Sequence, residues 1–172
     1  MERLVRKAIK GDTDAFLELM DQNMQILYKT AWSVLRNNED ASDAVAETIL
    51  TCFEKIDTLR NPAAFRTWLI RILLNHCYAI IREQAHYDRS GEIPSKSEMR
   101  EWQGKEEDSF QELIQGIGEK YSTIITLYYA DELTIREIAE VVGLNENTVK
   151  TRLVRGRELI RRRMNHEKKM EE

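Results

Sequence analysis

Residues 133–160 read LTIREIAEVVGLNENTVKTRLVRGRELI, a pattern that predicts two short helices separated by a tight turn. Thr134 and Glu137 stand three residues apart, as in a capping box that begins the first helix. Gly143 is expected to end that helix, because glycine adopts the left-handed C′ conformation with little strain. Asn145 is then expected to cap the second helix.

The residues of both predicted helices divide between an inner and an outer face. Helical spacing predicts an apolar face on the first helix, made of Ile135, Ile138, Ala139 and Val142. The inward residues of the second helix are expected to be Val149, Leu153, Gly156 and Ile160. The residues left on its outer face are Lys150, Thr151, Val154 and Arg155.

A helix, a glycine-containing turn and a basic second helix are typical of the DNA-binding helix-turn-helix. Arginine reads guanine O6 and N7 with its two-pronged guanidinium, and the methyl groups of threonine and valine contact the thymine methyl. The alternative is an amphipathic helical hairpin that is merely solvated. Agreement among the caps, the turn glycine and the outward cations favours DNA binding.

The composition indicates an all-α protein, built as one large domain or two small ones. The 172 residues include 2 prolines and 7 glycines, too few for an all-β protein with many turns. The formal net charge is −4, but the charge is segregated: lysine and arginine dominate residues 150–163, and acids dominate residues 92–112. Such a chain is repelled by DNA overall and attracted at one patch, so a partner is expected to help it bind.

The two cysteines, Cys52 and Cys77, lack CxxC spacing and suit core positions in a reducing cytoplasm. A zinc site made of these two residues with His76 and His86 is conceivable, but the spacing fits no standard site. We therefore expect no metal and no cofactor. No apolar run approaches the ~20 residues of a membrane span and no signal peptide is present, so we expect a soluble, cytoplasmic protein without membrane insertion.

The rest of the chain predicts further helices. Apolar spacing and breaks place them at residues 2–10, 14–36, 38–56 (with Asn38 as its cap), 63–83, 108–116 and 119–129. Residues 57–64 are expected to form a loop, and the polar residues 86–107 an interdomain linker in which Trp102 packs on a neighbouring domain or partner. The helix at 38–56 is expected to bury a stripe: Ala41, Ala44, Val45, Thr48, Ile49, Cys52, Phe53 and Ile56.

The whole arrangement resembles the extracytoplasmic-function (group IV) branch of the sigma-70 family of bacterial sigma factors. Residues 38–49, NEDASDAVAETI, are similar to the region 2.2 motif, and residues 65–72, FRTWLIRI, with Asn75 resemble regions 2.3 and 2.4. Residues 133–157 resemble region 4.2. The chain departs from the family pattern at Ala46, Ala79, Ile117-Gly118 and Ser122, which affects individual contacts more than the fold.

This resemblance implies a region 2 domain at residues 1–85, a linker at 86–107 and a region 4 domain at 108–172. The implied partners are the β′ clamp and β flap of core RNA polymerase, promoter DNA, and an anti-sigma factor that is typically anchored in the membrane. Contacts with the polymerase are expected from Asp40, Asp43, Glu47, Ile49 and Leu50. Contacts with the −10 element are expected from Arg60, Asn61, Arg66, Arg71, Asn75 and Arg82, and contacts with the −35 element from Asn147, Lys150, Thr151, Arg152, Val154, Arg155 and Arg157.

In this interpretation one −10 base leaves the duplex at the loop 57–64, whereas Trp68 is expected to be a core residue rather than a base-stacking one. Apolar side chains on more than one side of the helix 63–83 indicate that it is either central in a bundle or partly covered by a partner, and we expect this apolar excess to form part of a docking surface for the anti-sigma factor.

Two other functions compete with this interpretation. One is a stand-alone helix-turn-helix regulator that binds duplex DNA tightly without polymerase. The other is a helical enzyme that uses Glu47, His76 or Cys77. No convincing nucleophile and base stand together in the sequence, so we expect no catalytic residue.

Overall fold

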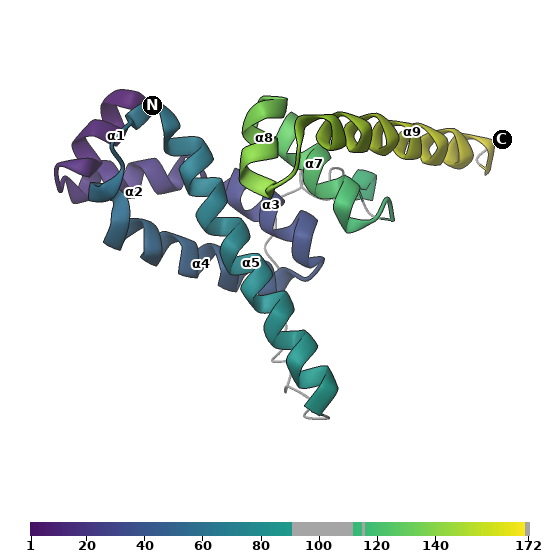
Figure 1. The fold of residues 1–172 in the computed structure, drawn as a ribbon, viewed down its shortest axis with the longest axis horizontal. Helices are drawn as coiled ribbons and strands as arrows, with labels where there is room; N and C mark the ends of the chain where they lie inside the picture. The colour runs from purple at the N-terminus through teal and green to yellow at the C-terminus, as the bar shows by residue number, and fades with distance from the viewer. Residues whose placement is uncertain (91–111, 115, 171–172) are drawn as a thin grey trace. The chain divides into compact units, whose positions relative to one another are not determined.

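The structure, a computed structural model, describes residues 1–90, 112–114 and 116–170. The chain divides into two compact units, Met1–Trp102 and Gln103–Glu172. All regular elements within the described residues are helical (Figure 1), which confirms the predicted all-α class. Residues 91–107 of the predicted linker, Trp102 among them, lie outside the described residues, as does most of the helix predicted at 108–116.

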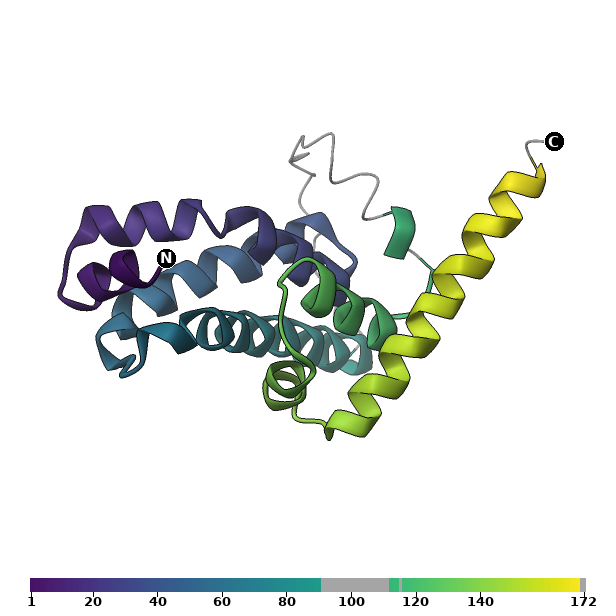
Figure 2. The ribbon, with the colours of Figure 1, turned by 90° about the horizontal axis from the view of Figure 1, so that it is seen from above.

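The first unit is a bundle whose core lies among three helices. Its elements are α1 (Glu2–Ile9), α2 (Thr13–Asp21), α3 (Met24–Leu35), α4 (Asn38–Lys55), the 3₁₀ turns η1 (Ile56–Thr58) and η2 (Pro62–Ala64), and α5 (Phe65–Ser90). Helices α3, α4 and α5 pack against one another (Figures 1 and 2). Helix α1 packs on α2 and on both 3₁₀ turns, through the buried Val5 and Ala8.

The single helix predicted for residues 14–36 is wrong, because the chain breaks at Asn23 into α2 and α3. The Asn23 side chain is almost fully buried, and its Nδ2 donates a hydrogen bond of 2.7 Å to the carbonyl of Leu19. That carbonyl would otherwise accept the backbone N–H of Asn23, which instead donates to Met20. A buried side chain has therefore replaced one bond of the helical ladder.

Helix α4 is capped by Asn37, one residue before the predicted Asn38. The Asn37 Oδ1 accepts a hydrogen bond of 3.0 Å from the backbone N–H of Asp40. The predicted buried stripe is correct except at its edges: Ile49 is half-buried, and Phe53 is 56% exposed. The Phe53 ring packs edge-on against Phe16, with 5.2 Å between ring centroids, so only one side of it is covered.

Helix α5 runs from Phe65 to Ser90, seven residues beyond the predicted end at 83. It is central to the bundle, and its fully buried side chains include Phe65, Leu69, Ile70, Leu73 and Leu74. Trp68 is half-buried rather than a core residue, because it lies between the buried stripe and the solvent face. The predicted loop at 57–64 contains η1 and η2 and is anchored by the buried Leu59.

The second unit contains α7 (Glu119–Tyr129), α8 (Ile135–Val142) and α9 (Glu146–Met170). The predicted helix signals are confirmed. Thr134 and Glu137 form the capping box, and Gly143 ends α8 in the left-handed conformation, with φ of 69°. The Asn145 Oδ1 accepts a hydrogen bond of 2.8 Å from the backbone N–H of Thr148 at the start of α9. Helix α9 packs on both α7 and α8.

Candidate nucleic-acid interface

Helix α9 presents the outer face that the sequence predicts. Val149, Leu153 and Gly156 are buried against the rest of the unit. Lys150, Thr151, Val154 and Arg155 are exposed, and Val154 is 52% exposed although it is apolar. An exposed valine between two cations gives this face apolar and charged groups side by side, as major-groove reading requires.

The polar side chains at the start of α9 are partly committed to the helix itself. The Thr151 hydroxyl donates a hydrogen bond of 2.9 Å to the backbone carbonyl of Asn147. The Thr148 hydroxyl donates to Asn145 Oδ1 over 3.0 Å. Both hydroxyl oxygens can therefore act toward a ligand only as acceptors, whereas the exposed side-chain amide of Asn147 retains its donors.

An open depression of about 380 Å³ lies between α7 and α9. We call it the α7–α9 depression, and it is lined by Lys120, Tyr121, Asn147, Thr148, Thr151, Arg152 and Arg155. Four of these residues were predicted as contacts with the −35 element: Asn147, Thr151, Arg152 and Arg155. Lys120 and Tyr121 were missed, since nothing in the sequence indicates which part of α7 lies beside α9.

A close approach of α7 and α9 brings Tyr121 next to the recognition helix. Gly156 is buried at the contact, where a Cβ atom would lie 3.0 Å from Ile125 Cγ1 and 3.5 Å from Tyr121 Cβ. The small residue at position 156 allows this separation. Tyr121 consequently stands beside Arg155, the residue that precedes Gly156.

Tyr121 is surrounded by positive charge. The Lys120 ammonium lies 4.9 Å from the centroid of the Tyr121 ring, within range of a cation–π interaction. Burial by itself raises the pKa of Tyr121, but hydrogen bonding and charge from Lys120, and then from Arg155, together lower it below its ordinary value.

Arg157 lies away from the α7–α9 depression. Its Nε donates a hydrogen bond of 2.7 Å to the Tyr129 hydroxyl. Its guanidinium carbon lies 5.4 Å and 5.5 Å from the ring centroids of Tyr128 and Tyr129. This predicted −35 residue is thus held against the end of α7 by two aromatic rings.

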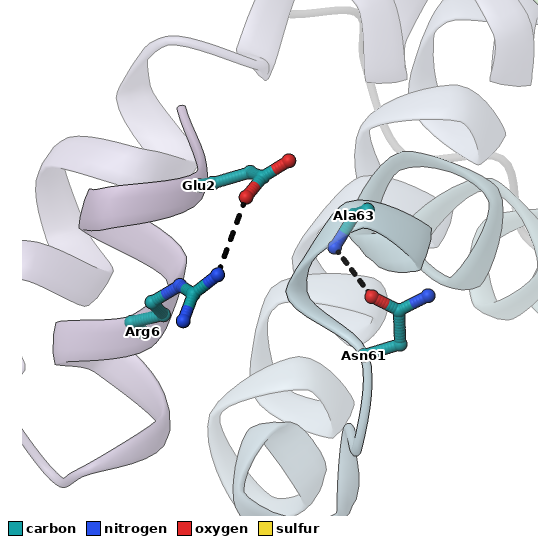
Figure 3. Close-up of polar contacts among 4 residues, drawn as sticks. All are labelled: Glu2, Arg6, Asn61 and Ala63. Atoms are coloured by element: carbon teal, nitrogen blue, oxygen red, sulfur yellow. Dashed lines mark hydrogen bonds and ion pairs between the residues drawn. The ribbon is translucent and has the colours of Figure 1, made fainter.

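The predicted −10 residues lie between the two 3₁₀ turns and along α5. Arg60 and Asn61 are exposed, and Asn61 Oδ1 accepts a hydrogen bond of 3.1 Å from the backbone N–H of Ala63 (Figure 3). Arg71, Asn75 and Arg82 are exposed at positions four and seven residues apart, so they lie along one face of the helix.

Arg66, the remaining predicted −10 residue, is half-buried near the start of α5.

Helix α1 lies beside the 3₁₀ turns and carries the ion pair between Arg6 and Glu2, with 3.5 Å between nitrogen and oxygen (Figure 3).

The predicted polymerase contacts lie on α4. Asp43 and Glu47 are exposed, and Leu50 is 58% exposed; the three follow one face of the helix. Asp40 is half-buried, and its carboxylate accepts a hydrogen bond of 2.9 Å from Gln84 Nε2 on α5. Ile49 is half-buried beside them. Phe53 adds an exposed aromatic ring to this helix that the sequence pattern assigned to the core.

Two of the three side chains named for the enzymatic alternative, His76 and Cys77, lie in the packing between helices, whereas Glu47 is exposed. His76 Nε2 and Thr51 Oγ1 are joined by a hydrogen bond of 2.9 Å between α5 and α4. Cys52 and Cys77 are fully buried, and burial raises the pKa of each thiol to about 12. The described residues contain no group of three His, Cys, Asp or Glu side chains placed to hold a metal ion, and each described helix is too short or too polar to span a bilayer.

A helical bundle and a second unit with a cationic recognition helix define a DNA-binding protein of the helix-turn-helix class. Residues 19–87 match the family described as Sigma-70 region 2, and residues 107–160 match Sigma-70, region 4. The chain therefore belongs to the sigma-70 family, and its similarity to an ECF sigma factor, given next, places it in the ECF branch.

Relatives support this membership along nearly the full chain. The chain is 35% identical to the RNA polymerase sigma factor SigV of Bacillus subtilis over 157 residues, which cover 88% of this chain and 93% of SigV. It is 30% identical over 184 residues to the ECF RNA polymerase sigma factor SigW of the same organism, covering 95% of this chain and 98% of SigW.

Solved structures share the fold. CnrH, in complex with the cytosolic domain of CnrY, superposes with a TM-score of 0.66 at 22% identity, covering 96% of this chain and 97% of CnrH. The sigma factor RpoE, in complex with the anti-sigma factor NepR from Bartonella quintana, gives a TM-score of 0.67 at 20% identity, covering 86% of this chain and 97% of RpoE.

Proposed function

We propose that this protein directs core RNA polymerase to specific promoters and promotes transcription initiation, as an ECF sigma factor. The observation that carries the proposal is the exposed cationic face of α9 on a helix-turn-helix, in a chain that also matches region 2. Polymerase performs the chemistry in such a system, so we assign this protein no catalytic residue.

The proposed −35 contact is made by the second unit, with α9 entering the major groove. Lys150, Thr151, Val154 and Arg155 are the outward residues that the sequence assigns to base edges. Arg152 and Arg157 are assigned to the phosphate backbone, where side chains position the protein, and Asn147 to the start of the same contact. To contact a DNA phosphate, the Arg157 side chain must either break its hydrogen bond with Tyr129 or reach the DNA from its position beside that ring.

The proposed −10 contact is made by Arg60, Asn61, Arg66, Arg71, Asn75 and Arg82. Because the Asn61 carbonyl oxygen already caps η2, only its Nδ2 donors are available to a flipped base. A base that offers an acceptor, such as a ring nitrogen or a carbonyl, would fit this geometry. Flipping costs a few kcal/mol, and this hydrogen bond would recover part of the cost.

The proposed polymerase contact is the face of α4 that carries Asp43, Glu47 and Leu50, with Asp40 and Ile49 at its side. Acidic groups around an exposed leucine suit a basic partner surface that also has an apolar centre. We assign the β′ clamp to this face and the β flap to the second unit. The domain limits of 85 and 107, and a linker between them, remain part of this proposal.

We further propose that an anti-sigma factor, anchored in the membrane, holds this protein inactive in the cytoplasm. The two solved structures support control by such a partner, since each is a complex of this kind of fold with another protein, and NepR is an anti-sigma factor. The apolar excess on residues 63–83 of α5, which includes the half-buried Ile72, Ile80 and Ile81, is our candidate for part of the docking surface.

The test is co-elution of the purified protein with bacterial core RNA polymerase in size-exclusion chromatography, beside a gel shift with free promoter duplex at physiological salt. We expect co-elution with polymerase and little binding to free duplex. Tight sequence-specific binding to duplex without polymerase association would instead establish a stand-alone regulator and refute the proposal.

A further inference from the structure

The α7–α9 depression places two positively charged side chains beside the Tyr121 hydroxyl. Lys120 comes from α7 and Arg155 from α9, and both interact with Tyr121. Among the described residues, neither cation forms an ion pair with a carboxylate. Two cations placed beside one phenol create a local positive potential, which attracts anions.

The geometry of this cluster is fixed by packing rather than by chance contact at the surface. The tight approach at Gly156, with Ile125 and Tyr121 on the other side, sets where the Tyr121 ring stands relative to Arg155. The Lys120 ammonium is held over the ring face. An N–H fork, an ammonium and a phenolic O–H therefore converge on one depression of about 380 Å³.

We propose that Lys120, Tyr121 and Arg155 form an oxyanion-binding site that grips one phosphate of the DNA backbone beside the recognition helix. Charge-assisted hydrogen bonds from arginine and lysine are the strong contacts for phosphodiester oxygens. Two of the three residues lie on α7, outside the recognition helix, so the ligand flanks the groove rather than lying on its floor. This inference deepens the proposed function and rests on it.

The site changes the role that the sequence gives to Arg155. From its outward position alone, Arg155 is grouped with the residues that read bases. Beside Tyr121 and Lys120 it becomes a backbone contact, which fixes the register of α9 in the groove without reading sequence. Base reading then falls to Lys150, Thr151 and Val154.

The test measures binding of the full-length protein to a fluorescent duplex without promoter sequence, by anisotropy across a range of low salt concentrations. Each phosphate contact contributes about 0.9 to the slope of log K against log salt. We expect the double variant Lys120→Ala/Arg155→Ala to reduce the magnitude of that slope by about 0.9, because both cations neutralise the same phosphate, and each single variant to reduce it by at most that amount. Tyr121→Phe should weaken binding by about two- to tenfold with an unchanged slope, because it removes a hydrogen bond and no charge.

Lys10→Ala is the matched control, since it removes one exposed positive charge just after α1, far along the chain from the second unit. It should leave the slope unchanged. Thermal unfolding followed by circular dichroism separates loss of the contact from loss of the fold. An unchanged slope for the double variant Lys120→Ala/Arg155→Ala in folded protein would overturn the proposal.

A second arm uses polymerase holoenzyme on promoter duplexes that differ at single −35 base pairs. Equal weakening by Arg155→Ala on all duplexes supports a backbone contact, whereas a penalty confined to one base pair overturns it. Because the first arm needs neither polymerase nor a promoter, it still decides the question if the proposed function fails.

A third arm tests whether free phosphate and DNA phosphate compete for the depression. Inorganic phosphate replaces chloride at equal ionic strength in the anisotropy assay. Extra displacement of the duplex that disappears in Arg155→Ala supports the backbone contact, because free phosphate displaces DNA only where the two compete for one site. Equal extra displacement in wild type and in Arg155→Ala would show that phosphate competes elsewhere and would overturn the assignment of the depression.

Discussion

The side-chain amide of Gln84 donates a hydrogen bond of 2.9 Å to the carboxylate of Asp40, and this bond joins the far part of α5 to the first turn of α4. Asp40 also lies within the proposed polymerase contact. The Asp40 carboxylate therefore has two roles: it accepts a hydrogen bond within the bundle, and we propose that it contacts the polymerase.

Substitutions at Gln84 and Asp40 separate the structural role of the carboxylate from its proposed role in polymerase binding. Gln84→Ala removes the hydrogen bond and leaves the Asp40 charge, so we expect it to lower the free energy of unfolding by about 0.5–1.5 kcal/mol with unchanged binding to core polymerase. Asp40→Ala should lower both. Urea denaturation and size-exclusion co-elution make the comparison. Equal polymerase binding by wild type and Asp40→Ala would remove Asp40 from the contact.

Leu50 offers a sharper test of the polymerase-binding face. Burying a leucine side chain on binding stabilises a complex by about 1.5–3 kcal/mol. We therefore expect Leu50→Ala to weaken the complex with core polymerase by about ten- to a hundredfold, with little effect on unfolding. Leu17→Ala is the matched control, because Leu17 on α2 is also 58% exposed and lies outside the proposed contact. Equal losses for the two variants in a competition assay would contradict the assignment of α4.

Asn61 permits a variant that preserves the cap and removes the proposed base contact. Asn61→Asp keeps an oxygen to accept from the Ala63 N–H and lacks the amide donors. We expect unchanged thermal stability and a loss of promoter opening of about tenfold, measured by permanganate reactivity of the melted −10 bases. Asn61→Ser, which also retains a capping oxygen without added charge, should behave alike. Loss in the aspartate variant alone would mean charge repulsion rather than a missing donor.

The cysteines predict a chemical readout of folding. Because burial raises the pKa of Cys52 and of Cys77 to about 12, only about one thiol in ten thousand is ionised at pH 8. Iodoacetamide should leave the native protein unmodified at this pH and label both residues once urea unfolds it, as mass spectrometry would record. Rapid labelling of native protein would show that the α4–α5 core opens readily.

The second unit was predictable from the sequence in most respects that matter for DNA binding. Helix caps bond to residues only a few positions away in the chain, so local spacing is sufficient to recognise them. This holds for the capping box of Thr134 and Glu137, for the C′ residue Gly143 and for the cap Asn145. The outward face of α9 follows from the same periodicity. The helices of the first unit were predicted less well, because the errors arise from contacts that form only when the bundle folds.

The break at Asn23 depends on a side chain that is buried only when the bundle forms, and the exposure of Phe53 depends on how Phe16 lies across it. Neither contact leaves a signature at helical spacing. The same is true of the charged groups around Tyr121, since Lys120 and Arg155 are 35 positions apart in the chain.

By itself, therefore, the sequence determined an all-α protein, a helix-turn-helix with its caps, and which face of α9 meets solvent, because hydrogen bonds and apolar spacing within single helices control these features. Only the tertiary structure decided that Tyr121 stands between Lys120 and Arg155. That arrangement exists because Gly156 lacks a side chain and lets α7 approach α9 closely, a packing relationship between distant residues that local pattern does not encode.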